Sequence, residues 1–157
     1  MTTDVSSLTV LLEQNERQRD AAIADHQRAI TAAEAASQQT EQLRVYRREY
    51  EQRWSAQFRV QGQIELVRCY QSFTERLTMA IEQQVHVAER AAQQVERALV
   101  ALRETEMRCA SVRKLIERRA HEMRVATERR DQKQSDEFAS RAAWSNRPSA
   151  HGGSRLM

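Results

Sequence analysis

Apolar residues recur along the chain at alternating steps of four and three residues, in two long runs. The first run passes through Leu8, Leu12, Asn15, Arg19, Ala22, His26, Ala29, Ala33, Ala36, Thr40, Leu43, Arg47, Tyr50 and Trp54. The second passes through Tyr70, Thr74, Leu77, Ile81, Gln84, Ala88, Ala91, Val95, Ala98, Leu102, Thr105, Cys109, Val112 and Ile116, and after a break at Arg119 it reaches Met123. This alternation is typical of the a and d positions of coiled coils, so we call each run a seam.

The two runs are separated by Gly62, the only glycine before His151, and the first proline is Pro148. If the chain folds back at Gly62, positions equidistant from this glycine face each other, and every seam residue of the first run meets one of the second. Leu43 then faces Ile81, and Trp54 faces Tyr70. The pattern predicts an antiparallel hairpin, with a dimer of unbroken helices as the alternative.

The expected fold is therefore all-α: two long helices in an antiparallel coiled-coil hairpin, with a C-terminal helical overhang and a short disordered tail. We expect one domain over residues 1–144, with the first helix at about 5–58, a turn at about 59–64 and the second helix at about 65–144. The second helix outlasts the first and continues until Pro148 stops it, and residues 145–157 form the disordered tail.

Composition excludes several classes of protein. Only 40% of the residues are hydrophobic and 30% are charged, with a net charge of +3. We find no signal-peptide pattern and no apolar run of about 18 residues that could span a membrane. The two cysteines fit a reducing compartment, so we expect a cytoplasmic protein.

Catalytic and metal-binding patterns are missing from the sequence. It has no Gly-rich phosphate loop, no cysteine pair at metal spacing and no nucleophile with a plausible base, so we expect no enzyme, metal or cofactor. Glu82, His86 and Glu89 share a helical face, which we interpret as a surface histidine in a salt bridge. The basic run between Arg108 and Arg130 leaves nucleic-acid binding as an alternative, although acidic residues interleave with the basic ones as on a solvated face.

Two aromatic residues stand beside the seam rather than in it. Tyr46 and Phe73 come out nearly level in the folded chain and, with Ala80, would form an apolar patch. Such a patch is typical of a partner-binding surface. The same two residues could instead widen the core near the turn, and the sequence leaves both interpretations open.

Three segments resemble the flagellar export protein family FliJ. They are residues 45–50 (VYRREY), residues 69–73 (CYQSF) followed by Leu77, Ala80 and Ile81, and residues 130–141 (RDQKQSDEFASR). The resemblance implies a stalk-like coiled coil of the flagellar type III export apparatus. Its expected partners are the hexameric export ATPase, the cytoplasmic domain of the export-gate membrane protein and export chaperones. The protein would then lie at the inner face of the cell membrane only through these partners.

The resemblance also implies two sets of binding residues. The expected gate-binding residues, here called the gate set, are Gln39, Leu43, Tyr46, Tyr50, Phe73, Leu77, Ala80 and Gln84. The expected ATPase-binding residues are Arg118, Arg119, Arg124, Arg129, Arg130 and Phe138. The equivalent stalk of a virulence injectisome remains an alternative within this class, although the 131–141 stretch favours a flagellar protein.

Overall fold

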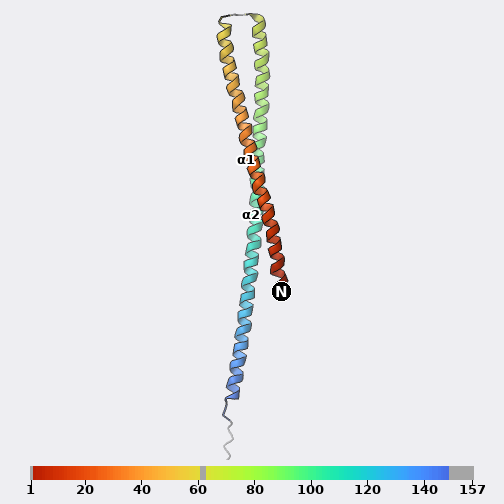
Figure 1. Cartoon of the computed structure of the whole chain (residues 1–157), viewed down its shortest axis with the longest axis vertical. Coiled ribbons are helices and arrows are strands. Elements are labelled where there is room, and N and C mark those ends of the chain that lie inside the picture. The colour runs from red at the N-terminus through yellow and green to blue at the C-terminus, as the bar shows by residue number, and fades with distance from the viewer. Residues whose placement is uncertain (1, 61–62, 149–157) are drawn as a thin grey trace, which may run out of the picture. The chain divides into compact units, whose positions relative to one another are not determined.

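Two long helices make up the part of the chain that the computed structural model describes, residues 2–60 and 63–148 (Figure 1). Helix α1 spans Thr2–Phe58 and helix α2 spans Ile64–Ser145. Both are rich in Ala, Gln, Glu and Arg, which favour helix at every position. Gly62 lies outside the described residues, and so does the expected 145–157 tail from Ser149 onward. At its start the predicted tail begins one residue too early, because Ser145 is the last residue of α2.

Helix α2 ends where proline makes continuation impossible. Its last turn is closed by a hydrogen bond from the Asn146 backbone N–H to the Ala142 carbonyl, at 3.2 Å. The Ser145 hydroxyl donates to the same carbonyl at 3.0 Å. Pro148 follows three residues later, and a proline cannot supply the backbone N–H that another helical turn requires.

The chain divides into two compact units, one made of residues 12–110 and the other of residues 1–11 and 111–157. In the 12–110 unit, α1 and α2 pack side by side in opposite directions. The rings of Trp54 and Tyr70 lie 6.2 Å apart, and the Gln84 side-chain amide donates to the Gln39 side-chain oxygen at 3.3 Å. These contacts confirm the expected antiparallel register, and they contradict the dimer of unbroken helices.

The seam is the core of this unit. None of its positions between Leu12 and Cys109 is classed as exposed, although many are only half-buried. The buried ones are Ala22, Ala29, Ala36, Thr40, Leu77, Ile81, Ala98 and Cys109. Four of these eight are alanines, which allow close approach of the helices but bury little apolar area, so the hydrophobic stabilisation per turn is small.

A charged residue also sits in the seam. Arg19 is half-buried and its guanidinium donates to the neighbouring Asp20 carboxylate at 3.0 Å. This hydrogen bond, together with attraction from the Asp20 carboxylate, raises the pKa of Arg19. Cys109 is the most buried side chain described, at 1% exposure. Polar positions of this kind reduce the stability of a coiled coil while fixing its register.

In the unit of residues 1–11 and 111–157, the seam continues only briefly. Leu8 and Ile116 are half-buried and Val112 is buried. Met123, which the sequence pattern assigned to the seam, is 39% exposed. That assignment is wrong, because no described residue of α1 faces Met123 in the antiparallel register.

The C-terminal overhang of α2, residues 118–144, is therefore helical and almost wholly solvated. Val125 is the one half-buried residue between Glu117 and Pro148. Phe138 and Trp144 are 76% and 74% exposed, and the Arg147 guanidinium lies 5.2 Å above the Trp144 ring. Within the described residues, neither helix is long and apolar enough at once to cross a membrane.

Candidate functional site

Six of the eight aromatic residues of the chain gather at the end of the 12–110 unit where α1 finishes and α2 starts. We call them the aromatic cluster: Tyr46, Tyr50, Trp54 and Phe58 from α1, and Tyr70 and Phe73 from α2. The four α1 members recur every fourth residue, which places them along one helical stripe. The sequence pattern predicted two pairs of this cluster, Trp54 with Tyr70 across the seam and Tyr46 with Phe73 beside it. It did not predict that all six rings form one group.

Tyr50 is the centre of the aromatic cluster. Its ring centroid lies 4.4 Å from that of Phe73, 5.8 Å from that of Tyr70 and 5.8 Å from that of Trp54. Phe58 closes the group edge-on against Tyr70 at 5.3 Å. Each such pair contributes about 0.5–1.5 kcal/mol beyond burial of its area, so this end of the hairpin is held much more firmly than the alanine-rich part.

Tyr46 lies at the edge of the aromatic cluster, and about half of its surface is exposed to solvent. It is 49% exposed, yet its ring is 6.3 Å from Tyr50 and edge-on to Phe73 at 6.5 Å. Phe73 is half-buried because it packs directly on Tyr50. The two interpretations left open by the sequence therefore apply to different residues: Phe73 widens the core, and Tyr46 presents its ring to solvent.

The gate set divides by exposure. Gln39, Tyr46 and Ala80 are exposed, whereas Leu77 is buried at 8% exposure. The half-buried members are Leu43, Tyr50, Phe73 and Gln84. Gln84 joins the two helices, because its amide donates both to Gln39 and to the Ala36 carbonyl at 3.4 Å. The set thus combines an exposed edge with the core residues that support it.

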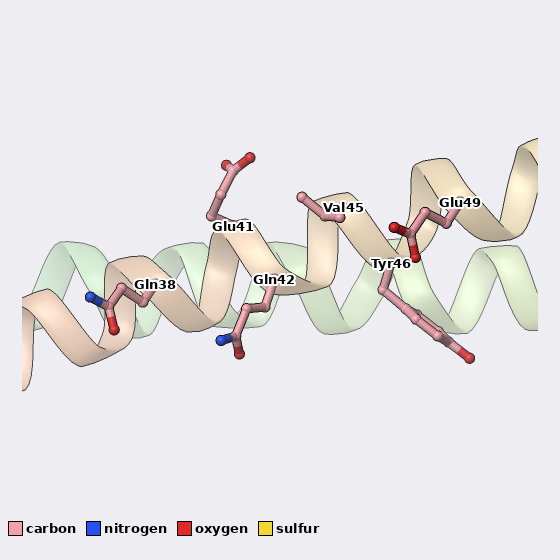
Figure 2. Close-up of a pocket in the computed structure, with 6 residues that line it drawn as sticks. All are labelled: Gln38, Glu41, Gln42, Val45, Tyr46 and Glu49. Carbon is pink, nitrogen blue, oxygen red and sulfur yellow. The ribbon is translucent and has the colours of Figure 1, made fainter.

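A shallow groove on α1 adds residues that sequence analysis missed. Figure 2 shows the side chains that line it, Gln38, Glu41, Gln42, Val45, Tyr46 and Glu49, along α1 with α2 behind. Val45 is 37% exposed and gives the groove a second apolar side chain beside Tyr46. Glu41 is held at 3.3 Å by Arg48. Tyr46 belongs to both features, so one ring joins the groove to the aromatic cluster.

The expected ATPase-binding residues lie together on α2 in the other unit. All six, Arg118, Arg119, Arg124, Arg129, Arg130 and Phe138, are exposed. They belong to the overhang, where acidic residues such as Glu122 and Glu128 interleave with the arginines. The overhang therefore offers positive charge and one large aromatic side chain on a helix that α1 does not cover.

One histidine elsewhere in the described residues lies beside a carboxylate. His86 Nδ1 lies 3.5 Å from the Glu89 carboxylate, and both side chains are exposed, which confirms the expected salt-bridged histidine. Across residues 2–60 and 63–148, no three His, Cys, Asp or Glu side chains are grouped so that they could hold a metal ion.

Comparison with known proteins adds a family to this geometry. A family model described as "Flagellar FliJ protein" matches residues 4–148, nearly the whole chain. Neither curated proteins nor solved structures give a match to the sequence. The match includes all three segments that resemble this family and both sets of expected binding residues. The chain therefore belongs to the FliJ family and is a component of the flagellar export apparatus.

Proposed function

We propose that this protein is an adaptor in flagellar export that binds the cytoplasmic domain of the export-gate protein and the hexameric export ATPase. The gate set of the 12–110 unit would contact the gate, and the overhang would contact the ATPase ring. Through these two interactions ATP hydrolysis would be coupled to export, and the protein would also escort export chaperones. Its membrane association would be peripheral and mediated by these partners.

The observation that carries the gate proposal is the half-exposed ring of Tyr46. A tyrosine ring held by two neighbouring rings loses little conformational entropy when a partner covers it. Aromatic side chains with a firm base are the residues that most often dominate binding energy. Gln39 and Ala80 lie exposed in the same unit and would complete the interface, while Leu77 and Tyr50 would act by holding the surface in shape.

The ATPase proposal rests on the overhang. A solvated helix without a packing partner is marginal in water, because most helical stability in proteins comes from burial of an apolar face. The exposed Phe138 and the arginines from Arg118 to Arg130 would be covered when the overhang enters an acidic opening of the ring. Family membership supports this assignment, since the family works within the export apparatus.

Replacement of Tyr46 by Ala tests the gate proposal. We expect Y46A to weaken binding of the full-length protein to the gate domain by about 2 kcal/mol, roughly 30-fold, as for an interface hot spot. Titration calorimetry would measure the affinity, and helical circular dichroism should be unchanged because Tyr46 is already half-exposed. The double variant Y46A/F73A should bind still more weakly, with some loss of stability from the cluster.

The matched control is M79A, which removes another exposed apolar side chain of the same unit, 67% exposed and outside the gate set. It should leave gate binding within about twofold, the change usual for a neutral surface site. Equal losses for Y46A and M79A, or full binding by Y46A, would contradict the proposal. Stimulation of the ATPase should persist in both variants.

A further inference from the structure

Helix α2 carries two heptad-spaced columns on one side of its seam in the 12–110 unit. The first column is mainly apolar and consists of Phe73, Ala80, Val87, Gln94 and Ala101. The second lies farther out and consists of Arg76, Gln83, Arg90 and Arg97. Residues seven apart lie nearly above one another on a helix, so the columns run parallel along one face. We call the stretch from Arg76 to Ala101 of these two columns the basic flank.

A groove between the two helices continues the basic flank onto α1. Four alanines line it, together with four polar or charged residues: Ala22, Ala29, Ala98 and Ala101, and Asp25, Arg28, Gln94 and Arg97. Because the alanine side chains are only methyl groups, another helix could approach this groove closely. Val87 extends the apolar surface toward Ala80 and is 41% exposed. The surface is therefore an apolar strip with polar rims, the shape that receives an amphipathic helix.

The charge on this flank is positive and unbalanced. Arg28 is neutralised by Asp25 at 2.7 Å. Arg76 donates to the Ser72 hydroxyl at 3.1 Å and Arg90 to the His86 carbonyl at 3.4 Å. Within the described residues, no carboxylate lies within salt-bridge distance of Arg76, Arg90 or Arg97.

The opposite side of the α2 seam has the reverse charge. Its outer column is Glu75, Glu82, Glu89 and Glu96, again seven residues apart. Between Glu75 and Arg97 the two signs are therefore separated across α2 rather than mixed, as they would be on a merely solvated face. A partner can therefore distinguish the two sides by electrostatics alone.

From these features we infer that the basic flank is a docking site for an acidic amphipathic helix. Its apolar stripe would cover Ala80, Val87 and Ala101, and its carboxylates would meet Arg90 and Arg97. From Ala80 to Ala101 the strip spans three heptads, roughly 32 Å at 1.5 Å per residue. The flank continues from the gate set, with which it shares Ala80. It does not rest on the gate or ATPase proposals, because Val87, Arg90 and Arg97 belong to neither set.

The test uses the full-length protein and a fluorescent synthetic helix of four heptads, with apolar a and d positions and Glu at e and g. We expect binding by fluorescence anisotropy, and little binding of the same peptide with Lys at e and g. The variant R90E/R97E should reduce the affinity roughly tenfold or more, because two attractive surface ion pairs become repulsive. The variant V87S should also bind more weakly, with unchanged circular dichroism.

The matched control is R44E/R103E, which changes the net charge equally on the other side of the unit. Arg44 lines the groove there with Val85 and Ala88, and Arg103 follows Glu96 by seven residues. This control should bind the acidic peptide nearly as the unchanged protein does. Equal losses in the two double variants, or equal binding of the Glu and Lys peptides, would overturn the inference.

A second copy of this chain, presenting its own glutamate column, is the competing occupant. Sedimentation of the unchanged protein would detect it as self-association. If self-association occurs and R90E/R97E abolishes it, the flank belongs to an interface between copies and the inference fails. A Y46A variant that still binds the acidic peptide would show that the two surfaces act separately.

Discussion

Threonine hydroxyls in the seam illustrate how single polar groups decide local stability. Thr40 is buried at 5% exposure and donates to the Ala36 carbonyl one turn earlier, at 2.9 Å. Thr105 likewise donates to the Leu102 carbonyl at 2.7 Å. Thr74 differs, because its buried Oγ1 has no hydrogen-bond partner anywhere in the described structure. A buried hydroxyl without a partner costs about 1–3 kcal/mol relative to its hydrated state.

Replacement of Thr74 by Val should therefore stabilise the hairpin. We expect T74V to raise the free energy of unfolding by about 1 kcal/mol, since it removes the unpaired hydroxyl and keeps the branched shape. Urea denaturation followed by circular dichroism measures this change. The control T40V should lower stability by about 1 kcal/mol, because it removes a satisfied hydrogen bond. A T74V protein that is destabilised as much as T40V would refute the explanation.

At the scale of elements, the heptad spacing predicted both helices and which side chains lie between them. From Leu8 to Ile116 the burial of the seam follows the sequence pattern, because a residue's position in the heptad fixes its direction from the helix axis. Met123 departs from the pattern because burial also needs a facing helix, which periodicity within one segment cannot supply. The groove at Val45 was also not predicted from periodicity. Val45 lies outside the seam, and in the sequence it cannot be distinguished from a single apolar residue on the surface.

The surroundings of the expected binding residues were less predictable than the core. The exposure of Tyr46 depends on how Phe73 packs against Tyr50. This packing is set by side-chain torsion angles, which the spacing of residues in the sequence does not predict. The role of Gln84 as a bridge between helices also follows from its reach to Gln39, rather than from its position in the seam. Charge columns on α2, in contrast, could be read directly from the sequence once the seam was known.

The overhang can be separated from the rest of α2 by truncation. A chain that ends after Arg118 should no longer stimulate the export ATPase, since it loses Arg119, Arg124, Arg129, Arg130 and Phe138. Its 12–110 unit keeps all of its packing, so the thermal unfolding midpoint should change by only about 2–4 °C, the effect of less than 1 kcal/mol. Phosphate release assays would measure the stimulation.

A chain that ends after Ser145 keeps α2 whole and is the control for this truncation. It should stimulate the ATPase as the full-length protein does. Undiminished stimulation by the chain that ends after Arg118 would contradict the assignment of the overhang. Loss of helical content in that chain beyond the deleted residues would instead show that the seam depends on the overhang.

For the whole molecule, the small amount of apolar area buried in the seam limits the stability of the free protein. The seam of the 12–110 unit contains Ala22, Ala29, Ala36 and Ala98 where many coiled coils have leucine, and Arg19 adds a charge. Burial of apolar area contributes about 25 cal/mol per Å² to stability. A seam with alanine in place of leucine buries less apolar area and therefore gains less hydrophobic stabilisation. We therefore expect a low unfolding midpoint for the free protein and strong stabilisation by any partner.

Thermal melts with and without the gate domain test this expectation. At a partner concentration 100 times its Kd, linkage predicts a gain of about 2.7 kcal/mol in the free energy of unfolding. The midpoint should therefore rise clearly, and the rise should shrink for Y46A at the same partner concentration because its Kd is larger. An unchanged midpoint at saturating partner would mean that binding does not favour the folded hairpin.

The positions of the two indole rings allow tryptophan fluorescence to follow both proposed interactions, with the gate and with the ATPase. The chain has two tryptophans: Trp54 packs among the rings of the aromatic cluster, and Trp144 is 74% exposed near the end of α2. Trp54 should therefore emit at shorter wavelength than Trp144. With either one changed to Phe, fluorescence from the other would follow engagement at one surface without any attached dye.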